Sequence, residues 1–404
     1  MKEAMAFTQA RDLLLNLVAP VGAERAALEA CAGRVLAQDL IAAENIPPFD
    51  RSPYDGYAFR AQDTQGASRA QPVTLTILEE VPAGAVPTKT VTAGTATKIL
   101  TGAPIPPGAD CVCMYEKTAF TAEAVTLFAP MQPGENVVYT GEDVRQGAVL
   151  ARCGDVIDAG IAGTLCAQGE AWPLVYRKLC VGIISTGNEV TEADAPPAPG
   201  KIRNANRHTL TAALQREGMA PVYLGLAGDD TDGIARRIEE GLSSCDAVLL
   251  TGGVSAGDYD LTPAAMERAG VPVLVRGVDI KPGMACAYGV RAGKPVCGLS
   301  GNPASALTNF YCVALPALRK MAGRSACIPP EITVTLQNGF SKKSRGTRVL
   351  RGRLDLTGGT ARMILPGDQG NVVLSSTIGC DVMAIVPAGS GALPEGTVLK
   401  GFVL

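Results

Sequence analysis

The chain has 404 residues, of which 47% are hydrophobic and 19% charged, and its formal net charge is −3. A chain this apolar can bury a substantial core, which excludes disorder as its main state. The slightly acidic balance excludes a broad nucleic-acid surface. A single histidine excludes a histidine-rich metal site and a catalytic histidine pair. The length predicts two to four domains, because most domains have about 100–200 residues.

The twelve cysteines are scattered along the chain, and no apolar export segment follows the N-terminus. This usage is typical of a reducing compartment, so we expect a cytoplasmic protein. No run of about 18 uncharged apolar residues predicts a membrane-spanning helix, and no membrane partner is expected. Cys111 and Cys113 have the spacing of half a zinc site, but no second pair follows at zinc-like spacing. We therefore expect two strand residues on one face.

The N-terminal third changes character twice along the chain. Residues 5–19 carry apolar side chains at helical spacing and predict an amphipathic helix, and the Ala/Leu-rich residues 23–31 predict a second one. Residues 46–139 are rich in Val, Thr, Pro and Gly and predict an inserted β domain. The flanking residues 1–45 and 140–177 then form one mixed domain that the insertion splits.

Residues 178–326 alternate between apolar runs and amphipathic stretches at short spacing. This pattern predicts a parallel sheet with helices on both faces. Ligands of such sheets bind beyond the carboxyl ends of the strands, and the polar glycine-containing motifs fall at those ends. After Pro329-Pro330, residues 331–404 predict a separate β domain. The strands expected in the sheet are 179–185, 222–226, 247–250 and 296–299, and the helices are 205–217 and 234–242.

The first motif, at residues 251–260, follows a predicted strand. Gly252 and Gly253 allow the backbone to approach a ligand closely, and exposed N–H groups there can cradle a phosphate, with Ser255 as a further donor. Asp258 would repel a phosphate directly, but it suits a metal ion that bridges to one. Taken alone, a plain glycine turn is an equally good interpretation.

The second motif ends the first strand of the same sheet and contains Glu189. Glu189 and Asp258 would lie on one rim, and two carboxylates beside a phosphate cradle suggest Mg²⁺. The third motif opens a helix, with Asn302 at the N-cap and Pro303 at the first helical position. A helix N-terminus attracts anions, Ser305 adds a hydroxyl, and Lys281 adds a cation. A turn glutamate, ordinary capping and a surface lysine are the plainer interpretations.

The fourth motif, residues 47–58, holds three prolines, and Asp55 precedes Gly56 as in a tight turn. In this order the four motifs resemble those of the molybdopterin molybdenumtransferase family, which includes MoeA and the E domain of gephyrin. The resemblance covers nearly the whole chain. Further matching pieces are Thr101–Pro104, Pro107–Asp110, Gly141–Arg145, Gln369–Gly370 and Ser375–Ser376.

The resemblance implies a multi-domain α/β plus β fold. Its parts would be the split N-terminal domain, the inserted β domain, an α/β domain of the molybdopterin-binding type, and a C-terminal β-barrel-like domain. It implies a homodimer in which Asp55 reaches the α/β domain of the other subunit. The implied enzyme is a transferase of molybdenum cofactor biosynthesis. It inserts molybdate into adenylylated molybdopterin, with Mg²⁺-dependent release of AMP, and the pathway's adenylyltransferase is a further candidate partner.

Site residues carry over position by position from the resemblance. Five acidic residues match positions for metal binding or water activation: Asp55, Asp143, Glu189, Asp229 and Asp258. Of these, Glu189, Asp229 and Asp258 would hold the metal. The positions for pterin or phosphate are Thr101, Gly252, Gly253 and Ser255. Those for the oxyanion are Lys281, Ser305, Arg351 and Ser375, with Asn302 as a further substrate-binding residue.

The chain also departs from the family pattern. Met284-Ala285 stands in place of a second Lys-Pro pair, Ser300 in place of a proline, and 203–206 in place of Tyr-Asp-Ser-Asn. The lost lysine predicts a weaker hold on a dianion, with Arg203 as a substitute cation. Three alternatives therefore stay open. They are a paralog that uses another oxyanion, a non-catalytic molybdopterin carrier or scaffold, and a nucleotide-cleaving hydrolase without metal insertion.

Overall fold

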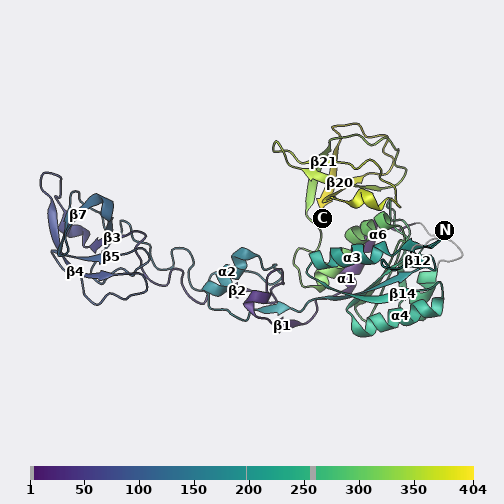
Figure 1. Cartoon of the computed structure of the whole chain (residues 1–404), viewed down its shortest axis with the longest axis horizontal. Coiled ribbons are helices and arrows are strands. Elements are labelled where there is room, and N and C mark those ends of the chain that lie inside the picture. Colours follow the sequence, from purple (N-terminus) through teal and green to yellow (C-terminus); the bar gives the residue numbers. More distant parts are fainter. Residues whose placement is uncertain (1–3, 197, 255–260) are drawn as a thin grey trace. The chain divides into compact units, whose positions relative to one another are not determined.

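The computed structural model describes residues 4–196, 198–254 and 261–404. It divides the chain into two compact units (Figure 1). The first unit is made of residues 1–38, 153–162 and 172–404, and the second of residues 39–152 and 163–171. None of the described helices is long and apolar enough to cross a membrane. The domain limits expected from the sequence stay predictions.

The second unit is built on a six-stranded sheet in the order β6-β3-β5-β4-β8-β7, with β4 and β5 parallel and the other pairs antiparallel. One face buries an aromatic and aliphatic core that includes Tyr57, Phe59, Cys111 and Cys113. The two cysteines thus share one face of β6, as expected. The strands are β3 (Gly56–Phe59), β4 (Val73–Val81), β5 (Thr95–Ile99), β6 (Cys111–Met114), β7 (Thr118–Phe120) and β8 (Ala124–Leu127), with β2 (Leu40–Ile41) pairing β9 (Val149–Ala151) apart from them.

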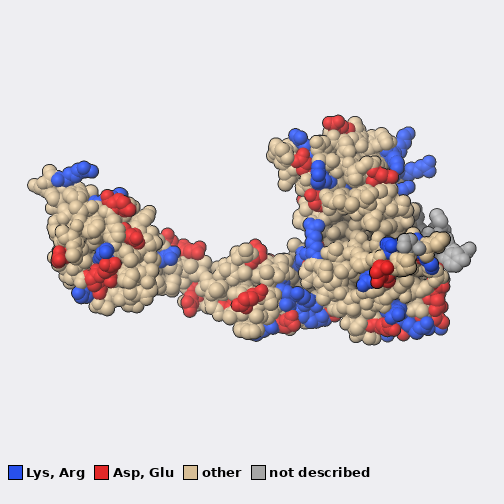
Figure 2. Space-filling model, viewed as in Figure 1, with Lys and Arg blue, Asp and Glu red and all other residues tan. Residues whose placement is uncertain are grey.

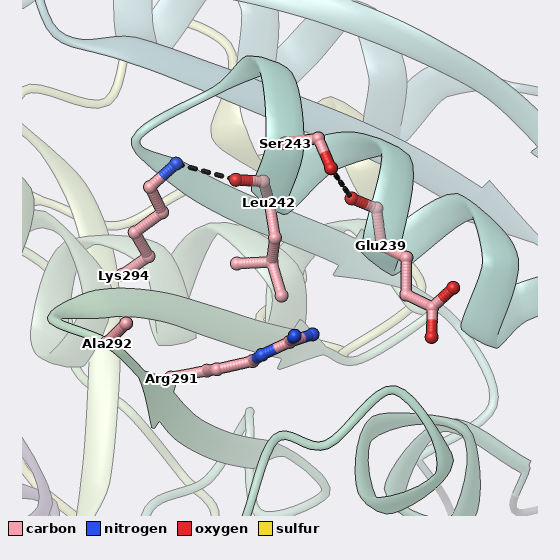
Figure 3. Close-up of a pocket in the computed structure, with 6 residues that line it drawn as sticks. All are labelled: Glu239, Leu242, Ser243, Arg291, Ala292 and Lys294. Atoms are coloured by element: carbon pink, nitrogen blue, oxygen red, sulfur yellow. Dashed lines mark hydrogen bonds between the residues drawn. The ribbon is translucent and has the colours of Figure 1, made fainter.

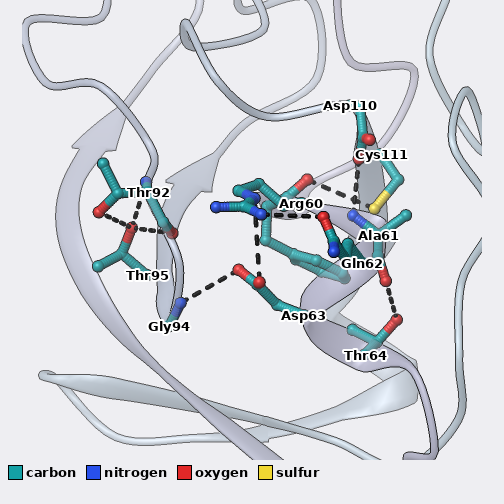
Figure 4. A network of polar contacts seen from close by, with 11 residues as sticks. Arg60, Ala61, Gln62, Asp63, Thr64, Thr92, Gly94, Thr95, Asp110 and Cys111 are labelled. Atoms are coloured by element: carbon teal, nitrogen blue, oxygen red, sulfur yellow. Dashed lines mark hydrogen bonds and ion pairs between the residues drawn. The ribbon is translucent and has the colours of Figure 1, made fainter.

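Side chains fix the loops of this sheet (Figure 4). Asp110 accepts the Ala61 N–H at 2.7 Å, which holds the first turn of the short helix η2 (Ala61–Thr64). Asp63 in the same helix accepts the Gly94 N–H at 3.1 Å. Asp110 belongs to one of the family-like sequence pieces, and its structural role here is to order a turn. The other short helical turn, η3 (Tyr115–Lys117), follows β6 directly.

The first unit contains a six-stranded sheet in the order β14-β11-β15-β18-β17-β16. The first four strands run parallel, β17 runs antiparallel to them, and the edge strand β16 pairs antiparallel with β17. The expected parallel sheet is thus present in four strands and is extended by an antiparallel strand, because a hairpin turn at 292–293 reverses the chain. The strands are β11 (Cys180–Thr186), β14 (Ala220–Ala227), β15 (Ala247–Thr251), β16 (Val273–Arg276), β17 (Ala287–Arg291) and β18 (Lys294–Leu299), and a parallel pair β12 (Val190–Thr191) and β13 (Ile202–Arg203) lies outside the sheet.

Helices cover both faces of this sheet, as predicted. Ile183 and Leu249 face one core cluster, and their neighbours Ile184 and Leu250 face the other, as the two-residue period of a strand requires. Helix α1 contributes Ala10 and Leu14 to the first cluster. The helices are α1 (Phe7–Leu17), α2 (Ala159–Ala167), α3 (Ala205–Arg216), α4 (Thr231–Ser244), α5 (Leu261–Arg268), α6 (Pro303–Asn309) and α7 (Leu315–Met321), with a π-helical turn η4 (Phe310–Ala314) joining α6 to α7.

The second helix expected over 23–31 is wrong. These residues form the short strand β1 (Ala23–Arg25) and the 3₁₀ turn η1 (Leu28–Ala30). Strand β1 pairs antiparallel with β10 (Leu174–Tyr176), a partner about 150 residues away in sequence. A tertiary pairing therefore overrides the local helical preference of an Ala/Leu-rich segment.

The C-terminal residues form a closed barrel in the order β19-β21-β20-β22-β23. Its interior is filled by aliphatic side chains such as Val334, Leu350 and Met363. Val349 and Phe402 on its outside join the core of the α/β sheet domain, so the barrel is packed against that domain. Its strands are β19 (Glu331–Leu336), β20 (Arg348–Asp355), β21 (Arg362–Ile364), β22 (Val382–Val386) and β23 (Val398–Val403), and the 3₁₀ turn η5 (Leu374–Thr377) precedes β22.

Candidate functional site

Four parallel strands of the α/β sheet end at the same edge, at Thr186, Ala227, Thr251 and Leu299. Backbone hydrogen bonds tie the following loops together. The Gly252 N–H donates to the Leu299 carbonyl at 3.1 Å, and the Gly187 N–H donates to the Ala227 carbonyl at 3.2 Å. The first three predicted motifs therefore begin at this edge, where ligands of such sheets bind, whereas the fourth belongs to the second unit.

Gly252 and Gly253 leave no room for side chains in the first of these loops. Gly252 has φ +103°, and a Cβ built on it would lie 2.5 Å from Thr186 Oγ1. Gly253 has φ +64°, and a Cβ there would lie 2.8 Å from Thr262 Oγ1. Both glycines are needed for the backbone to take this path, and a bare backbone is what a phosphate cradle requires. Ser255 and Asp258 of the same motif lie outside the described residues.

Glu189 and Asp229 follow neighbouring strands of this edge, and both are exposed. The Asn188 N–H donates to Asp229 Oδ2 at 3.2 Å, which joins the two loops. The Glu189 carboxylate folds back over Gly187, where a Cβ would lie 2.6 Å from both of its oxygens. In the described part of the chain neither carboxylate forms an ion pair with Lys or Arg, and no three His, Cys, Asp or Glu side chains gather closely enough to hold a metal. The third predicted ligand, Asp258, belongs to the segment that is not described.

Arg351, on strand β20 of the barrel, is fully buried. Its Nη2 donates to the Gly370 carbonyl at 3.1 Å and to Ser376 Oγ at 2.9 Å, whereas its Nε and Nη1 are buried without a hydrogen-bond partner. Burial lowers the pKa of Arg351, against smaller opposing effects of Cys380 and Asp368. Within the ranges that the structure describes, no carboxylate forms an ion pair with it. A buried cation without a counter-charge is costly, so the site favours an anion.

The hydroxyl that contacts Arg351 belongs to Ser376, which is buried, whereas the predicted Ser375 is exposed on the same turn η5. Gln369 supports the arginine from the other side. Its Oε1 accepts the Arg351 N–H at 3.0 Å, and its Nε2 donates to the Arg351 carbonyl at 2.9 Å. Ser376 and Gln369 were both present in the matching sequence pieces, but their roles depend on orientations that the sequence does not show.

Lys281 is placed next to this barrel strand by its backbone. Its N–H donates to the Thr347 carbonyl and its carbonyl accepts the Val349 N–H, both at 2.9 Å. The Lys281 side chain is exposed. Strand β20 therefore both carries Arg351 and pairs with the segment that carries Lys281. Strand β20 thus links the backbones of the two predicted oxyanion cations.

Helix α6 begins beside the loop that contacts Arg351, because the Ala304 N–H donates to the Asn371 carbonyl at 3.2 Å. The predicted N-cap Asn302 and first helical residue Pro303 are confirmed, although the Asn302 side chain makes no capping bond. Ser305 is 3% exposed and lies in the first turn. These residues lie between the sheet edge and the barrel.

Two residues at which the chain departs from the family pattern can now be placed. Met284 is 61% exposed in the loop of Lys281, so no core contact depends on it. The Arg203 guanidinium donates to the carbonyls of Glu192, Ala193 and Ala195 in its own loop. The hypothesis that Arg203 replaces the missing lysine finds no support here, because its Nη1 is bonded to carbonyls of its own loop.

In the second unit, Asp55 is exposed and tightly held. Its Oδ1 accepts the Thr101 N–H at 2.7 Å and the Thr101 hydroxyl at 2.8 Å. These two hydrogen bonds lower the pKa of Asp55. Thr101, a predicted pterin or phosphate ligand, thus donates both its N–H and its hydroxyl to Asp55 and orients that carboxylate. The predicted Asp143 is exposed, with its N–H bonded to the Ile46 carbonyl at 3.0 Å.

A separate hollow lies at the other end of the α/β sheet, where α4 ends beside the turn between β17 and β18 (Figure 3). Lys294 Nζ donates to the carbonyls of Leu242 and Cys245 at 2.6 and 2.8 Å, so this cation closes the helix end. Arg291 donates to the Ala269 carbonyl at 2.8 Å. These cations have structural partners, and the predicted site residues are elsewhere.

On the face that Figure 2 presents, acidic and basic side chains are interspersed.

Comparison with known proteins agrees with these features. Residues 5–169 match the family model for the MoeA N-terminal region (domain I and II), and residues 182–320 match that for a probable molybdopterin binding domain. A molybdopterin molybdenumtransferase of Staphylococcus aureus (strain Mu50) is 34% identical over 390 residues, covering 96% of this chain and 93% of the relative. One of Staphylococcus epidermidis (strain RP62A) is 32% identical over 372 residues, covering 92% and 89%.

Solved structures agree as well. The molybdopterin biosynthesis MoeA protein of Pyrococcus horikoshii OT3 is 32% identical, covers 100% of both chains and superposes with a TM-score of 0.86. The predicted fold class and the resemblance read from the sequence motifs are both confirmed. The chain belongs to the MoeA family of molybdopterin molybdenumtransferases.

Proposed function

We propose that this chain is a molybdenum insertase of molybdenum cofactor biosynthesis, which transfers molybdate to the dithiolene of adenylylated molybdopterin and releases AMP. The observation that carries the proposal is Arg351, a fully buried guanidinium with two unpaired nitrogens and no ion-paired carboxylate in the described chain. A planar guanidinium presents its donors as a fork that suits tetrahedral oxyanions. Lys281 and the hydroxyl groups near α6 and η5 would complete a site for a dianion.

The phosphate end of the substrate is proposed at the carboxyl edge of the α/β sheet. The bare backbone of Gly252 and Gly253 suits phosphate oxygens, because no Cβ separates them from the N–H groups. Glu189 and Asp229 suit Mg²⁺, which commonly uses one or two carboxylates and completes its shell with water and substrate phosphates. Both are exposed and lack a competing Lys or Arg in the described part of the chain. Bound there, Mg²⁺ would offset phosphate charge.

Asp55 and Asp143 are proposed to act from the second unit. The lowered pKa keeps Asp55 ionised, so it suits electrostatic positioning of water or metal better than strong general-base catalysis. Following the family resemblance, we propose a cytoplasmic homodimer in which Asp55 of one subunit serves the sheet edge of the other. The pathway's adenylyltransferase would deliver the substrate.

In the proposed reaction, water cleaves the phosphoanhydride and AMP leaves with one phosphate, while the other phosphate stays on the pterin. The two dithiolene sulfurs become ligands of molybdenum, and molybdate gives up oxygen as water. Arg351 and Lys281 bind the oxyanion before this exchange, and the glycine loop holds the phosphates. The role of these residues is to position the reactants.

The test is a reconstituted reaction of the purified chain with adenylylated molybdopterin and Mg²⁺, with and without molybdate. AMP and pterin-bound molybdenum are both measured. The expected result is the formation of both products, dependent on molybdate. AMP release without metal insertion would contradict the insertase and indicate a hydrolase, and tight pterin binding without either product would indicate a carrier.

A paralog for another oxyanion is the second candidate, and it is favoured by the apolar, exposed Met284 at the position of a second lysine. A pocket with one cation fewer discriminates less strongly for a compact dianion. The same assay with tungstate tests the second candidate, because a chain tuned to that oxyanion would incorporate tungsten faster than molybdenum.

A further inference from the structure

We infer that Asn309 is a positioning residue for Lys281, an inference that rests on the proposed oxyanion site. Asn309 is the last residue of α6 and is 0% exposed. Its Nδ2 donates to the Gly283 carbonyl at 2.6 Å. Gly283 lies two residues after Lys281, so the buried Asn309 side chain is hydrogen-bonded to the loop from which the lysine side chain extends.

The loop is held at two points, and Asn309 supplies one of them. Strand β20 binds the Lys281 backbone through Thr347 and Val349. Between the two points, Pro282 has a fixed φ, and Gly283 has φ +111°, where a Cβ would lie 2.9 Å from Asn309 Nδ2. The Lys281 side chain therefore starts from a backbone clamped between α6 and the barrel.

Packing alone does not explain an asparagine at this position. Its Oδ1 is buried and has no hydrogen-bond partner. An unpaired buried acceptor destabilises a fold, and an apolar side chain would avoid that cost. The π-helical turn η4 begins at the next residue, Phe310, and such turns are frequent at functional sites. What the amide provides is its donor to the Gly283 carbonyl.

The hydrogen bond from Asn309 to the loop at 281–284 matters more in this chain, because that loop has one lysine. Met284 occupies the position at which the family pattern has a second one. With no neighbouring ammonium to compensate, displacement of Lys281 removes the loop's whole contribution to the charge of the site. Loosening the loop should therefore weaken oxyanion binding through Lys281 and through no other group.

The test is a double-mutant cycle on the full chain, with sodium molybdate alone as the probe and calorimetry as the measurement. Asn309→Ala is expected to weaken molybdate binding roughly three- to tenfold, a usual size for coupled neighbours. In a Lys281→Met background the same substitution should change the affinity less than about twofold. Thr308→Val is the matched control. Thr308 is equally buried on the same helix, but its hydroxyl bonds the Ala304 carbonyl at 2.8 Å and does not touch the loop.

Two results would overturn the inference. One is a folded Asn309→Ala protein that binds molybdate like the parent, and the other is an equal loss in the Lys281→Met background. If Asn309→Ala does not fold, Gly283→Ala perturbs the same contact from the loop side, with the same expected loss. A parent chain that binds no molybdate refutes the proposed oxyanion site itself. Amide hydrogen exchange at Lys281, Gly283 and Met284, expected to accelerate in Asn309→Ala, then still reports whether Asn309 holds the loop.

Discussion

Arg351 and Asp55 represent two opposite ways of holding a charge at the residue scale. Arg351 is desolvated and its pKa is lowered by burial, whereas Asp55 is exposed and its pKa is lowered by donated hydrogen bonds. A buried cation without a counter-charge is energetically unfavourable in the free protein and becomes favourable when an anion binds. A substitution of Arg351 should therefore change the affinity for an anion much more than it changes the free energy of unfolding.

Arg351→Met is expected to lower molybdate affinity by about tenfold or more, because charge-assisted hydrogen bonds contribute about 1.5–3 kcal/mol. The free energy of unfolding should change by no more than about 1 kcal/mol, since the loss of two hydrogen bonds is offset by removal of a buried charge. Calorimetry and urea denaturation measure the two quantities. Arg353→Met, an exposed position on the same strand, is the control. Severe destabilisation with unchanged affinity would make Arg351 structural.

Met284→Lys restores the second loop cation at an exposed position. We expect molybdate affinity to rise roughly two- to fivefold at low salt, the range of exposed charge pairs, and the gain to shrink at high salt. Titrations at two ionic strengths measure the effect. An affinity that does not rise would refute the argument that the pocket is short of charge.

The pH response of Asp55 depends on Thr101. Thr101→Val removes one of the two hydrogen bonds, so the pKa of Asp55 should rise toward the ordinary aspartate value. A depressed folded pKa stabilises the fold above the unfolded pKa, and this stability is lost as the pH falls through the folded pKa. In the variant this stability should therefore be smaller, and its loss should be complete at a higher pH. NMR titration of the Asp55 carboxyl measures the shift, and Thr140→Val, which removes the matching bond to Asp50, is the control that should leave it unchanged.

Among the elements of the candidate site, the loops at the sheet edge approach one another so closely that Gly252 has no room for a side chain. Gly252→Ala puts a Cβ into Thr186 and forces a positive φ, whereas Gly293→Ala forces a positive φ of +77° where nothing lies within 4 Å. Backbone strain alone costs about 1–3 kcal/mol. Gly252→Ala should therefore destabilise the chain more than Gly293→Ala, and it alone should reduce AMP release. Urea denaturation and the AMP assay measure both. Equal effects on AMP release would remove the Gly252 loop from the proposed phosphate site.

Elements with strong periodicity were predictable from the sequence. Strands β11 and β15 and helix α4 lie close to their expected ranges because each buries a regular apolar pattern. Residues 23–31 were not predictable, because their pairing partner β10 is distant in the chain. The same limit applies within the candidate site. The motifs indicated Arg351, but which of Ser375 and Ser376 turns toward it depends on packing of η5, and Asn309 stands in an apolar helix without any motif.

In the whole molecule, the two units carry different residues of the proposed active site. Asp55 and Asp143 belong to one, and the sheet edge and the oxyanion residues belong to the other. A symmetric dimer can join such parts between subunits. In the proposed homodimer, Asp55 of one subunit would serve the sheet edge of the other, and a mixing experiment tests this proposal.

Subunits with Asp55→Ala and subunits with Glu189→Ala should each be inactive alone. Unfolded together and refolded as an equal mixture, they should recover about a quarter of the parent AMP release. Half of the random dimers are then mixed, and one of the two sites in each mixed dimer is intact. Refolded parent protein and an Asp55→Ala mixture with Asp143→Ala, which alters the same unit, are the controls. A mixture without recovered activity would contradict sites shared between subunits.

The double role of β20 has a thermodynamic consequence. This one strand carries the buried guanidinium and pairs with the lysine segment of the α/β domain, so an oxyanion held by both cations, as proposed, would bridge two packed domains. Anything that separated the barrel from the sheet domain would dismantle the binding site, and a bound oxyanion opposes that separation through linkage. If the proposed site is correct, bound substrate would therefore stabilise the packing of the barrel against the sheet domain, and its release would weaken that packing.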